Sequence, residues 1–212
     1  MKPPLPRTVH GRVMHELGHR IVTGACRPGE VLPNEEELCR AMGVSRTALR
    51  EAVKVLAAKG LLDSRQRSGT RVRAPEHWHQ LDPDVLAWRS EAGDPRWAGQ
   101  LAELRRIVEP AAAALAARRR TPAQLEAIEA AHAALLAASD PGPKGVAAVQ
   151  FHAAVFAAAG NPLLGALAAL AAVAPGGPIA GEALAGLLEA IRRRDEQAAS
   201  ECMLGLLPPD PC

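Results

Sequence analysis

The chain is poor in the features that mark secreted, membrane-bound or metal-binding proteins. Its four cysteines are scattered and show no metal-type spacing, which makes reduced thiols the default expectation (Cys26, Cys39, Cys202 and Cys212). The first thirty residues lack the continuous apolar core of a signal peptide. The alanine-rich run over residues 163–174 is too short to span a bilayer. We therefore expect a cytoplasmic protein without a membrane partner.

The patterns of the common enzyme classes are also missing. The sequence shows no nucleophile–base pair, no glycine-rich phosphate loop and no paired carboxylates suited to acid–base catalysis. After residue 73, no segment has the alternating pattern of a β-strand. These absences predict a protein that is not an enzyme and whose second part is built from helices.

Charge is plentiful but unevenly distributed. Residues 1–75 hold 14 Lys and Arg against 7 Asp and Glu, whereas residues 76–212 hold 11 against 16. A basic first third and an acidic remainder predict that only the first third meets nucleic acid. The length of 212 residues is enough for two small domains, each with its own core.

Residues 34–59 have the pattern of two short helices separated by a tight turn. Asn34 and Glu37 form a capping-box-like start for the first helix, and Gly43 suits its end because glycine tolerates left-handed backbone geometry. Ser45 then caps a second helix. The apolar residues of that second helix share one arc and its basic residues share the opposite arc, so one face packs and the other is basic. The pattern is typical of a helix-turn-helix.

The basic face of the second helix carries the side chains that we expect to read DNA. Arg46, Thr47 and Arg50 follow Ser45 in the first turn and a half, the part of a recognition helix that reaches base edges. An arginine can bond O6 and N7 of guanine together, which is worth about 1–3 kcal/mol of discrimination. Lys54 lies further along and is better placed for phosphate, so we expect it to add affinity without reading sequence.

A basic β-hairpin is predicted directly after this helix. Gly60 closes the helix, and residues 61–65 and 70–73 have the pattern of short strands around a turn at residues 68–69. Their alternation can place four arginines on one face and turn Val72 inward. The alternative is a solvated basic hairpin on an ordinary surface. The order of caps, amphipathic helix and hairpin favours a wing that contacts the minor groove or its phosphates through Arg65, Arg67, Gly69, Thr70 and Arg71.

These residues resemble the GntR family of bacterial transcription regulators. The resemblance covers residues 8–73 and is carried by PGEVLPNEEEL, GVSRTALREAVKVLAAKGLL and the wing GTRV. GTRVRAPEHWHQLDPDVLAW extends it to the FadR-type subfamily, and within that to repressors of sugar-acid catabolism, those of galactonate operons in particular. It implies a winged helix-turn-helix that binds double-stranded operator DNA. One departure is Glu36, because many members carry a basic residue there, which implies one DNA contact fewer.

The rest of the chain is predicted to form an all-α domain. We expect the DNA-binding domain over residues 1–74, a linker over 75–81 and a helical effector-binding and dimerisation domain over 82–212, with Asp82 and Pro83 starting its first helix. Proline-glycine stretches at 140–143 and 175–178 are expected to break the chain. The result is a bundle of about six helices, the last over residues 179–206.

Two aromatic residues and two histidines surround the expected linker. Trp78 and Trp88 are expected to staple the two domains together. His77 and His79 could pair as metal ligands on one face of an extended segment, but two histidines alone are a weak signal.

The helical part resembles the FCD ligand-binding domain of FadR-type regulators in a shortened form. ELRRIVEPAAAALAA, FHAAVFAAAGNPLL and LLEAIRRRDEQAA carry the resemblance. It implies a metal bound by one aspartate and three histidines, which together with an arginine holds a carboxylate effector. His152 matches the first histidine, whereas the other three ligand positions fall on Ala148, Leu184 and Leu206. One ligand of four does not hold a divalent metal against water, so we expect no cofactor.

Two candidate effector-binding residues remain in this domain. Arg105 matches the arginine that the family points into its pocket and could bind a carboxylate without a metal, or it could be a surface or interhelix arginine beside Arg106. His152 could line the pocket or simply be a histidine of the core.

These patterns predict a sequence-specific DNA-binding transcription regulator that is not an enzyme. We expect a repressor of a sugar-acid or other carboxylate catabolic operon, released by a small carboxylate effector such as a sugar acid. A homodimer is expected because a single recognition helix makes too few contacts for operator affinity. One alternative is a constitutive DNA binder whose effector domain has degenerated. A remote alternative is a metal- or carboxylate-handling enzyme, which only His152 supports.

Overall fold

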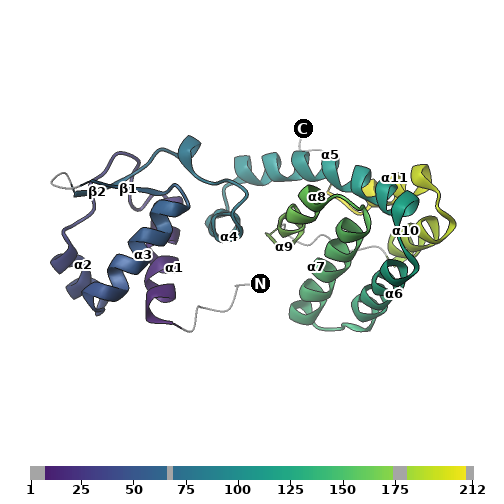
Figure 1. Ribbon diagram of the computed structural model, residues 1–212, viewed down its shortest axis with the longest axis horizontal. Coiled ribbons are helices and arrows are strands. Elements are labelled where there is room, and N and C mark those ends of the chain that lie inside the picture. Colours follow the sequence, from purple (N-terminus) through teal and green to yellow (C-terminus); the bar gives the residue numbers. More distant parts are fainter. Residues whose placement is uncertain (1–7, 66–68, 174–180, 209–212) are drawn as a thin grey trace. The chain divides into compact units, whose positions relative to one another are not determined.

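The structure is a computed structural model that describes residues 8–65, 69–173 and 181–208, and these residues are mainly helical (Figure 1). They divide into two compact units, and the boundary in the sequence falls between Asp94 and Pro95. Among the described residues, no helix is long and apolar enough to cross a membrane.

The N-terminal unit is a winged helix-turn-helix, as predicted. Its elements in chain order are α1 (Val9–Val22), α2 (Glu35–Met42), α3 (Arg46–Ala58), β1 (Leu62–Arg65), β2 (Gly69–Val72), the 3-10 helix η1 (Pro75–His77) and α4 (Pro83–Ala92). Side-chain oxygens of Asn34 and Ser45 accept hydrogen bonds from the first turns of α2 and α3, and Glu37 completes a capping box with Asn34. Gly43 ends α2 with a φ of 64°, in the left-handed region that favours glycine.

The core of this unit lies between α1 and α3. Its buried members come from both helices, from the wing and from the segments that join them. Val13 and Leu17 of α1 and Leu49 and Leu56 of α3 are all at most 2% exposed. Because α1 covers the apolar face of α3, the basic face of α3 is left outside.

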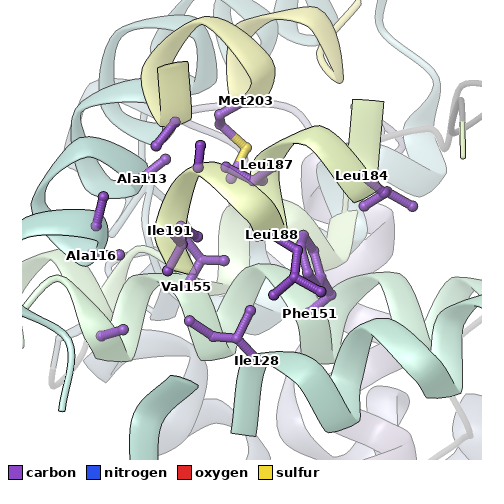
Figure 2. Packing of buried hydrophobic residues seen from close by; sticks show 14 of the residues in the cluster. Ala113, Ala116, Ile128, Phe151, Val155, Leu184, Leu187, Leu188, Ile191 and Met203 are labelled. Carbon is purple, nitrogen blue, oxygen red and sulfur yellow. The ribbon is translucent and has the colours of Figure 1, made fainter. Parts of the chain in front are cut away.

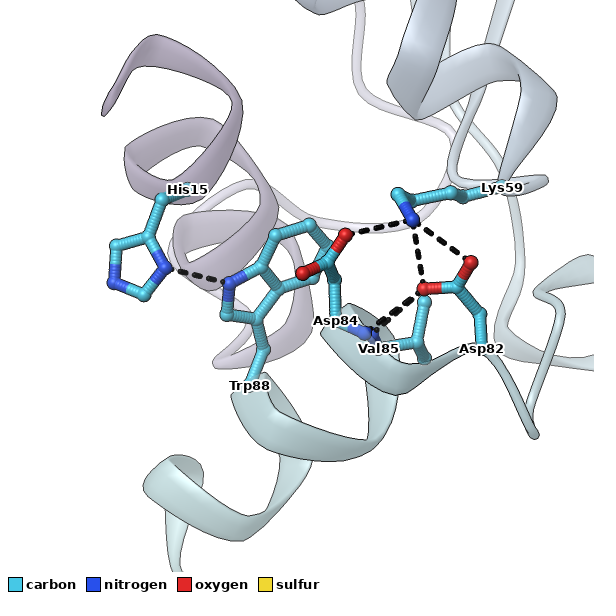
Figure 3. Close-up of polar contacts among 6 residues, drawn as sticks. All are labelled: His15, Lys59, Asp82, Asp84, Val85 and Trp88. Carbon is cyan, nitrogen blue, oxygen red and sulfur yellow. Dashed lines mark hydrogen bonds and ion pairs between the residues drawn. The ribbon is translucent and has the colours of Figure 1, made fainter. Parts of the chain in front are cut away.

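Helix α4 belongs to this unit rather than to the helical domain expected from residue 82 onward. Trp88 of α4 is buried against Gly18 of α1, and its Nε1 donates to Nδ1 of His15 at 3.0 Å (Figure 3). Trp78 and Val85 lie in the same core. Both tryptophans therefore pack within the N-terminal unit, where Trp88 fixes α4 to α1.

An ion-pair cluster ties the start of α4 to the end of α3. Nζ of Lys59 lies 2.8 Å from a carboxylate oxygen of Asp82 and 2.7 Å from one of Asp84 (Figure 3). Burial by itself lowers the pKa of Lys59, but the hydrogen bonds to the two aspartates outweigh it, so the pKa is raised. Lys59 therefore stays charged at neutral pH. Asp82 also caps α4, as predicted.

The C-terminal unit is all-α in its described part. Its elements are α5 (Pro95–Arg119), α6 (Pro122–Ala137), α7 (Pro141–Ala158), α8 (Pro162–Ala166), α9 (Ala169–Val173), α10 (Gly181–Arg193) and α11 (Glu196–Gly205). Its main core joins small and large apolar side chains of α5, α6, α7, α10 and α11 (Figure 2). Ala113 and Ala116 of α5 are 0% exposed, and alanine at these positions lets neighbouring helices approach closely.

Two expected helix boundaries in this unit were wrong. The Pro-Gly-Pro stretch at 141–143 does not precede α7 but forms its first turn, where proline needs no hydrogen-bond partner for its nitrogen. The expected last helix is broken into α10 and α11 at Arg194, whose φ is 59°. The side chain of Asp195 caps α11 by accepting from the backbone N–H of Ala198. The expected proline-glycine break at 175–178 lies outside the described residues.

The contact between Gly18 and Trp88 can be tested through stability. A Cβ added at Gly18 would lie only 2.4 Å from an atom of the Trp88 ring. We expect Gly18→Ala to lower the free energy of unfolding by about 1–3 kcal/mol, because the indole must shift. Chemical denaturation followed by tryptophan fluorescence measures the change.

The matched control is Gly145→Ala in α7, where nothing lies within 4 Å of the added Cβ. This variant should be neutral or gain about 0.5–1 kcal/mol, because alanine is the better helix former. Equal stability of the two variants would contradict the packing described for Trp88.

Candidate nucleic-acid interface and effector site

The predicted DNA-reading residues form one exposed side of α3. Arg46, Thr47, Arg50 and Lys54 are exposed, whereas the opposite side of the helix is in the core. Ser45 is exposed as well, but its hydroxyl accepts a hydrogen bond from the backbone N–H of Ala48 at 3.2 Å and so serves as the cap of α3. The first turn and a half of α3 thus presents Arg46, Thr47 and Arg50, whose functional groups can donate to base edges.

Arg50 is held by an acidic side chain that the sequence did not single out. Its Nε lies 3.0 Å from Oε2 of Glu35 at the start of α2. The other carboxylate oxygen of Glu35 is buried and has no hydrogen-bond partner among the described residues. The two residues stand fifteen positions apart in the chain, so only the packing of α2 against α3 brings them together. Glu36, one residue on, pairs instead with Arg40 within α2 at 3.1 Å.

The wing is an antiparallel pair of short strands. Leu62 pairs with Val72, and Asp63 pairs with Arg71. Leu62 and Val72 are buried, so Val72 is turned inward as predicted, and Arg71 on the alternate face is exposed. The guanidinium of Arg71 donates to the carbonyl oxygen of Gly29. This bond steadies the wing against the segment before α2.

Two arginines of the predicted wing surface fall at the turn of the hairpin. Arg65 stands opposite Gly69 in the strand register. The side chain of Arg65 and all of Arg67 lie outside the described residues.

A hollow of about 350 Å³ connects the two parts of the predicted interface. Arg50 and Lys54 from α3, Glu35 from α2 and Thr70 from β2 all line it. The fold therefore places the reading helix and the wing around one surface, which the linear sequence could only suggest from their order.

The family's metal ligand positions do not fit a metal in the C-terminal unit. Leu184 is 2% exposed in the main core, and Ala148 and Leu206 pack against the same core. None of these three side chains has an atom that can bind a cation. In the described part of the chain, no three His, Cys, Asp or Glu side chains are grouped so that they could hold a metal ion. His77 and His79 are exposed beside η1.

Arg105 and His152, the two effector candidates, are brought together by a third residue, Glu109. Arg105 and Glu109 stand one turn apart on α5, and His152 projects from α7. Nε of Arg105 lies 2.5 Å from Oε1 of Glu109, and its Nη2 lies 3.4 Å from Oε2. Nδ1 of His152 lies 2.9 Å from the same Oε2. Nδ1 of His152 is buried, and apart from this close approach it has no hydrogen-bond partner among the described residues.

Glu109 is charged although it is fully buried. Burial by itself raises the pKa of its carboxyl, but hydrogen bonds and charge interactions with His152 and Arg105 outweigh it and lower the pKa below the ordinary value. A carboxyl with a lowered pKa adds stability above its unfolded-state pKa, and loses that stability only as the pH falls through the lowered value. At neutral pH Glu109 is therefore a carboxylate that pairs with Arg105 and lies beside the ring of His152.

Sequence reasoning missed Glu109. The signal was present, because an arginine and a glutamate four residues apart on a helix share one face. What the spacing could not show is that this face points into the bundle and meets His152.

Comparison with known proteins agrees with this architecture. Residues 10–72 match the model of the bacterial regulatory proteins of the gntR family, and residues 100–174 match that of the FCD domain. The galactonate operon transcriptional repressor of Escherichia coli K12 is 41% identical over 121 residues, which are 57% of this chain and 53% of that protein. YieP of the same organism, an uncharacterized HTH-type transcriptional regulator, is 44% identical over 48% of this chain and 45% of its own length. The chain thus spans about half the length of these curated relatives.

Solved structures with a similar fold align with nearly the whole chain. GntR of Streptococcus agalactiae aligns with a TM-score of 0.52 and 29% identity, over 92% of this chain and 95% of that one. Lar of Listeria monocytogenes aligns with a TM-score of 0.65 over 95% of this chain and 94% of that one; at 21% identity it supports the fold alone. The chain thus combines a helix-turn-helix domain that matches the gntR family with a helical region that matches the FCD domain, and it is similar to the galactonate operon repressor.

Proposed function

We propose that the protein is a sequence-specific repressor of a sugar-acid or other carboxylate catabolic operon, acting as a homodimer in the cytoplasm. The observation that carries the proposal is the exposed basic side of α3, with Arg46, Thr47 and Arg50 in its first turns, beside the wing. Two such helices related by a two-fold axis would match the half-sites of a short palindrome. The likeness to a galactonate operon repressor supports the class of operon.

In this proposal a small carboxylate binds in the C-terminal unit and releases the DNA. Arg105 supports the choice of a carboxylate, because the planar guanidinium offers paired N–H donors that match the two oxygens. His152 adds a ring nitrogen beside it. No step is assigned to a metal, because the side chains at three of the four family ligand positions cannot bind one. Effector and operator binding would be coupled through two states of the dimer.

A second candidate is a constitutive DNA binder whose effector domain has lost its ligand. One observation favours it, namely that Arg105 already has a carboxylate partner in Glu109. The relatives named above are transcription regulators, so both candidates keep DNA as the partner and neither needs catalysis.

A binding assay with DNA from upstream of the protein's own gene tests the function. We expect a discrete complex at physiological salt that an unrelated duplex of equal length does not compete away, because specific contacts exceed phosphate contacts. Adding D-galactonate should release the DNA, and galactitol, which lacks the carboxylate, serves as its matched control. A complex that no sugar acid releases would point to the constitutive binder, and equal affinity for all duplexes would sink the proposal.

Substitutions along α3 distinguish side chains that recognise the base sequence from side chains that only attract the DNA by charge. Arg46→Ala and Arg50→Ala should each lose about 1–3 kcal/mol on the cognate site and relax base preference. Lys54→Ala should weaken binding to all DNA sequences alike, and it should reduce the slope of log affinity against log salt concentration by about one unit. Fluorescence anisotropy with cognate and scrambled duplexes at several salt concentrations measures both effects. If the Lys54 variant loses cognate binding selectively, Lys54 belongs with the reading residues.

Glu35 should restrain Arg50 in the free protein. Exposed ion pairs are worth about 0.2–1 kcal/mol, so Glu35→Gln is expected to tighten cognate binding by up to about fivefold. The control is Glu36→Gln, which removes the same charge from the neighbouring position without touching Arg50. Loss of charge alone raises affinity for every duplex, whereas release of Arg50 raises the ratio of cognate to scrambled binding. If the ratio of cognate to scrambled binding is unchanged in the Glu35 variant, Glu35 does not restrain Arg50.

A further inference from the structure

The buried cluster in the C-terminal unit is a carboxylate-binding arrangement that the chain itself fills. Glu109 is 0% exposed, whereas the side chains of Arg105 and His152 are 8% and 11% exposed. Arg105 and His152 are therefore buried as well, although slightly less than Glu109.

The geometry of the guanidinium allows a second carboxylate. Glu109 takes the edge formed by Nε and Nη2 of Arg105. The guanidinium has a second edge, formed by Nη1 and Nη2, whose two N–H donors match the two oxygens of a planar carboxylate. A ligand at that edge would stand close to Glu109, and two like charges near one arginine repel each other. The ligand and Glu109 would therefore compete for Arg105.

Charge balance makes this competition strong. Ala148, Leu184 and Leu206 contribute no positive charge to the core beside the cluster. Arg105 is thus the cation that pairs with Glu109, and Nδ1 of His152 lies 2.9 Å from the same carboxylate. A buried charge without a partner is costly, so a carboxylate entering this place must either displace Glu109 or remain weakly bound.

We propose that Glu109 is an internal carboxylate that occupies the effector's place at Arg105 and His152, and so sets the affinity of the domain for carboxylate effectors. The inference rests on the proposed function, since it concerns the same effector site. Glu109 is then a specificity-determining residue. Effector binding then exchanges the carboxylate of Glu109 for that of the effector. Removal of Glu109 leaves Arg105 and His152 free to bind an external carboxylate.

Chemical rescue of Glu109→Ala in the full-length protein tests the exchange. The substitution removes a methylene and a carboxylate, which together have the size of acetate. We expect acetate to raise the unfolding temperature of this variant more than that of the wild type, because it binds the folded state. Acetamide has the same shape without the charge and should not rescue. Glu103→Ala is the matched control, because Glu103 is an exposed glutamate on the same helix.

Glu109→Gln provides a second measurement that does not depend on a cavity. The amide has nearly the same shape as the carboxylate but carries no charge, so Arg105 is left without a charged partner. Acetate would then form the charge-assisted hydrogen bonds to Arg105, which are the stronger kind. Titration calorimetry should show acetate binding at least about tenfold tighter than in the wild type. If neither Glu109 variant responds to acetate more than the Glu103 variant does, the inference is overturned. If the alanine variant folds only with acetate present, that result supports it.

The outcome also separates this inference from the choice of effector. Acetate rescue without release of DNA by D-galactonate supports the internal carboxylate and overturns only galactonate as the effector. Release of wild-type and Glu109→Gln protein from DNA at the same galactonate concentration overturns the inference and leaves the proposed function standing. Release of the variant at a lower concentration supports both.

Discussion

The N-terminal unit depends on the two-faced character of α3. One side of the helix is apolar and must be buried, and α1 together with the wing buries it. The other side carries Arg46, Arg50 and Lys54, whose charges cannot be buried without partners and therefore stay at the surface. The same packing that makes the unit stable thus decides which side chains remain available to DNA. Helix α4 stabilises this unit further, because Trp88 and the ion pairs of Lys59 hold α4 against α1 and α3.

In each unit, an arginine that we propose as a ligand-binding residue forms an ion pair with a glutamate. In the N-terminal unit, Arg50 pairs with Glu35 at the surface, where water and salt weaken the attraction. In the C-terminal unit, Arg105 pairs with Glu109 in the core, where the surroundings screen little. The surface pair is therefore an easily broken restraint on a DNA contact. The buried pair is therefore the harder of the two to separate.

The elements of the fold were largely predictable because their ends carry local signals. The capping boxes at Asn34 and Thr121 involve residues three apart, and both form as their sequences indicate. The errors arose where a local signal had two meanings. Proline can break a helix or begin one, and the stretch at 141–143 begins α7. The break at Arg194 follows from a backbone conformation that is uncommon for arginine and so was not visible in the helical pattern.

What the sequence determined by itself is the class of the protein and the chemistry of its DNA-reading helix. Periodicity and caps set which residues of α3 share a face, since helical geometry depends only on spacing. The tertiary structure decided which charges meet. Glu35 reaches Arg50 across a turn, α4 joins the DNA-binding unit, and Glu109 connects Arg105 to His152 on another helix. These contacts arise from the packing of helices distant in the chain, and such packing follows from the whole set of side chains rather than from any local pattern.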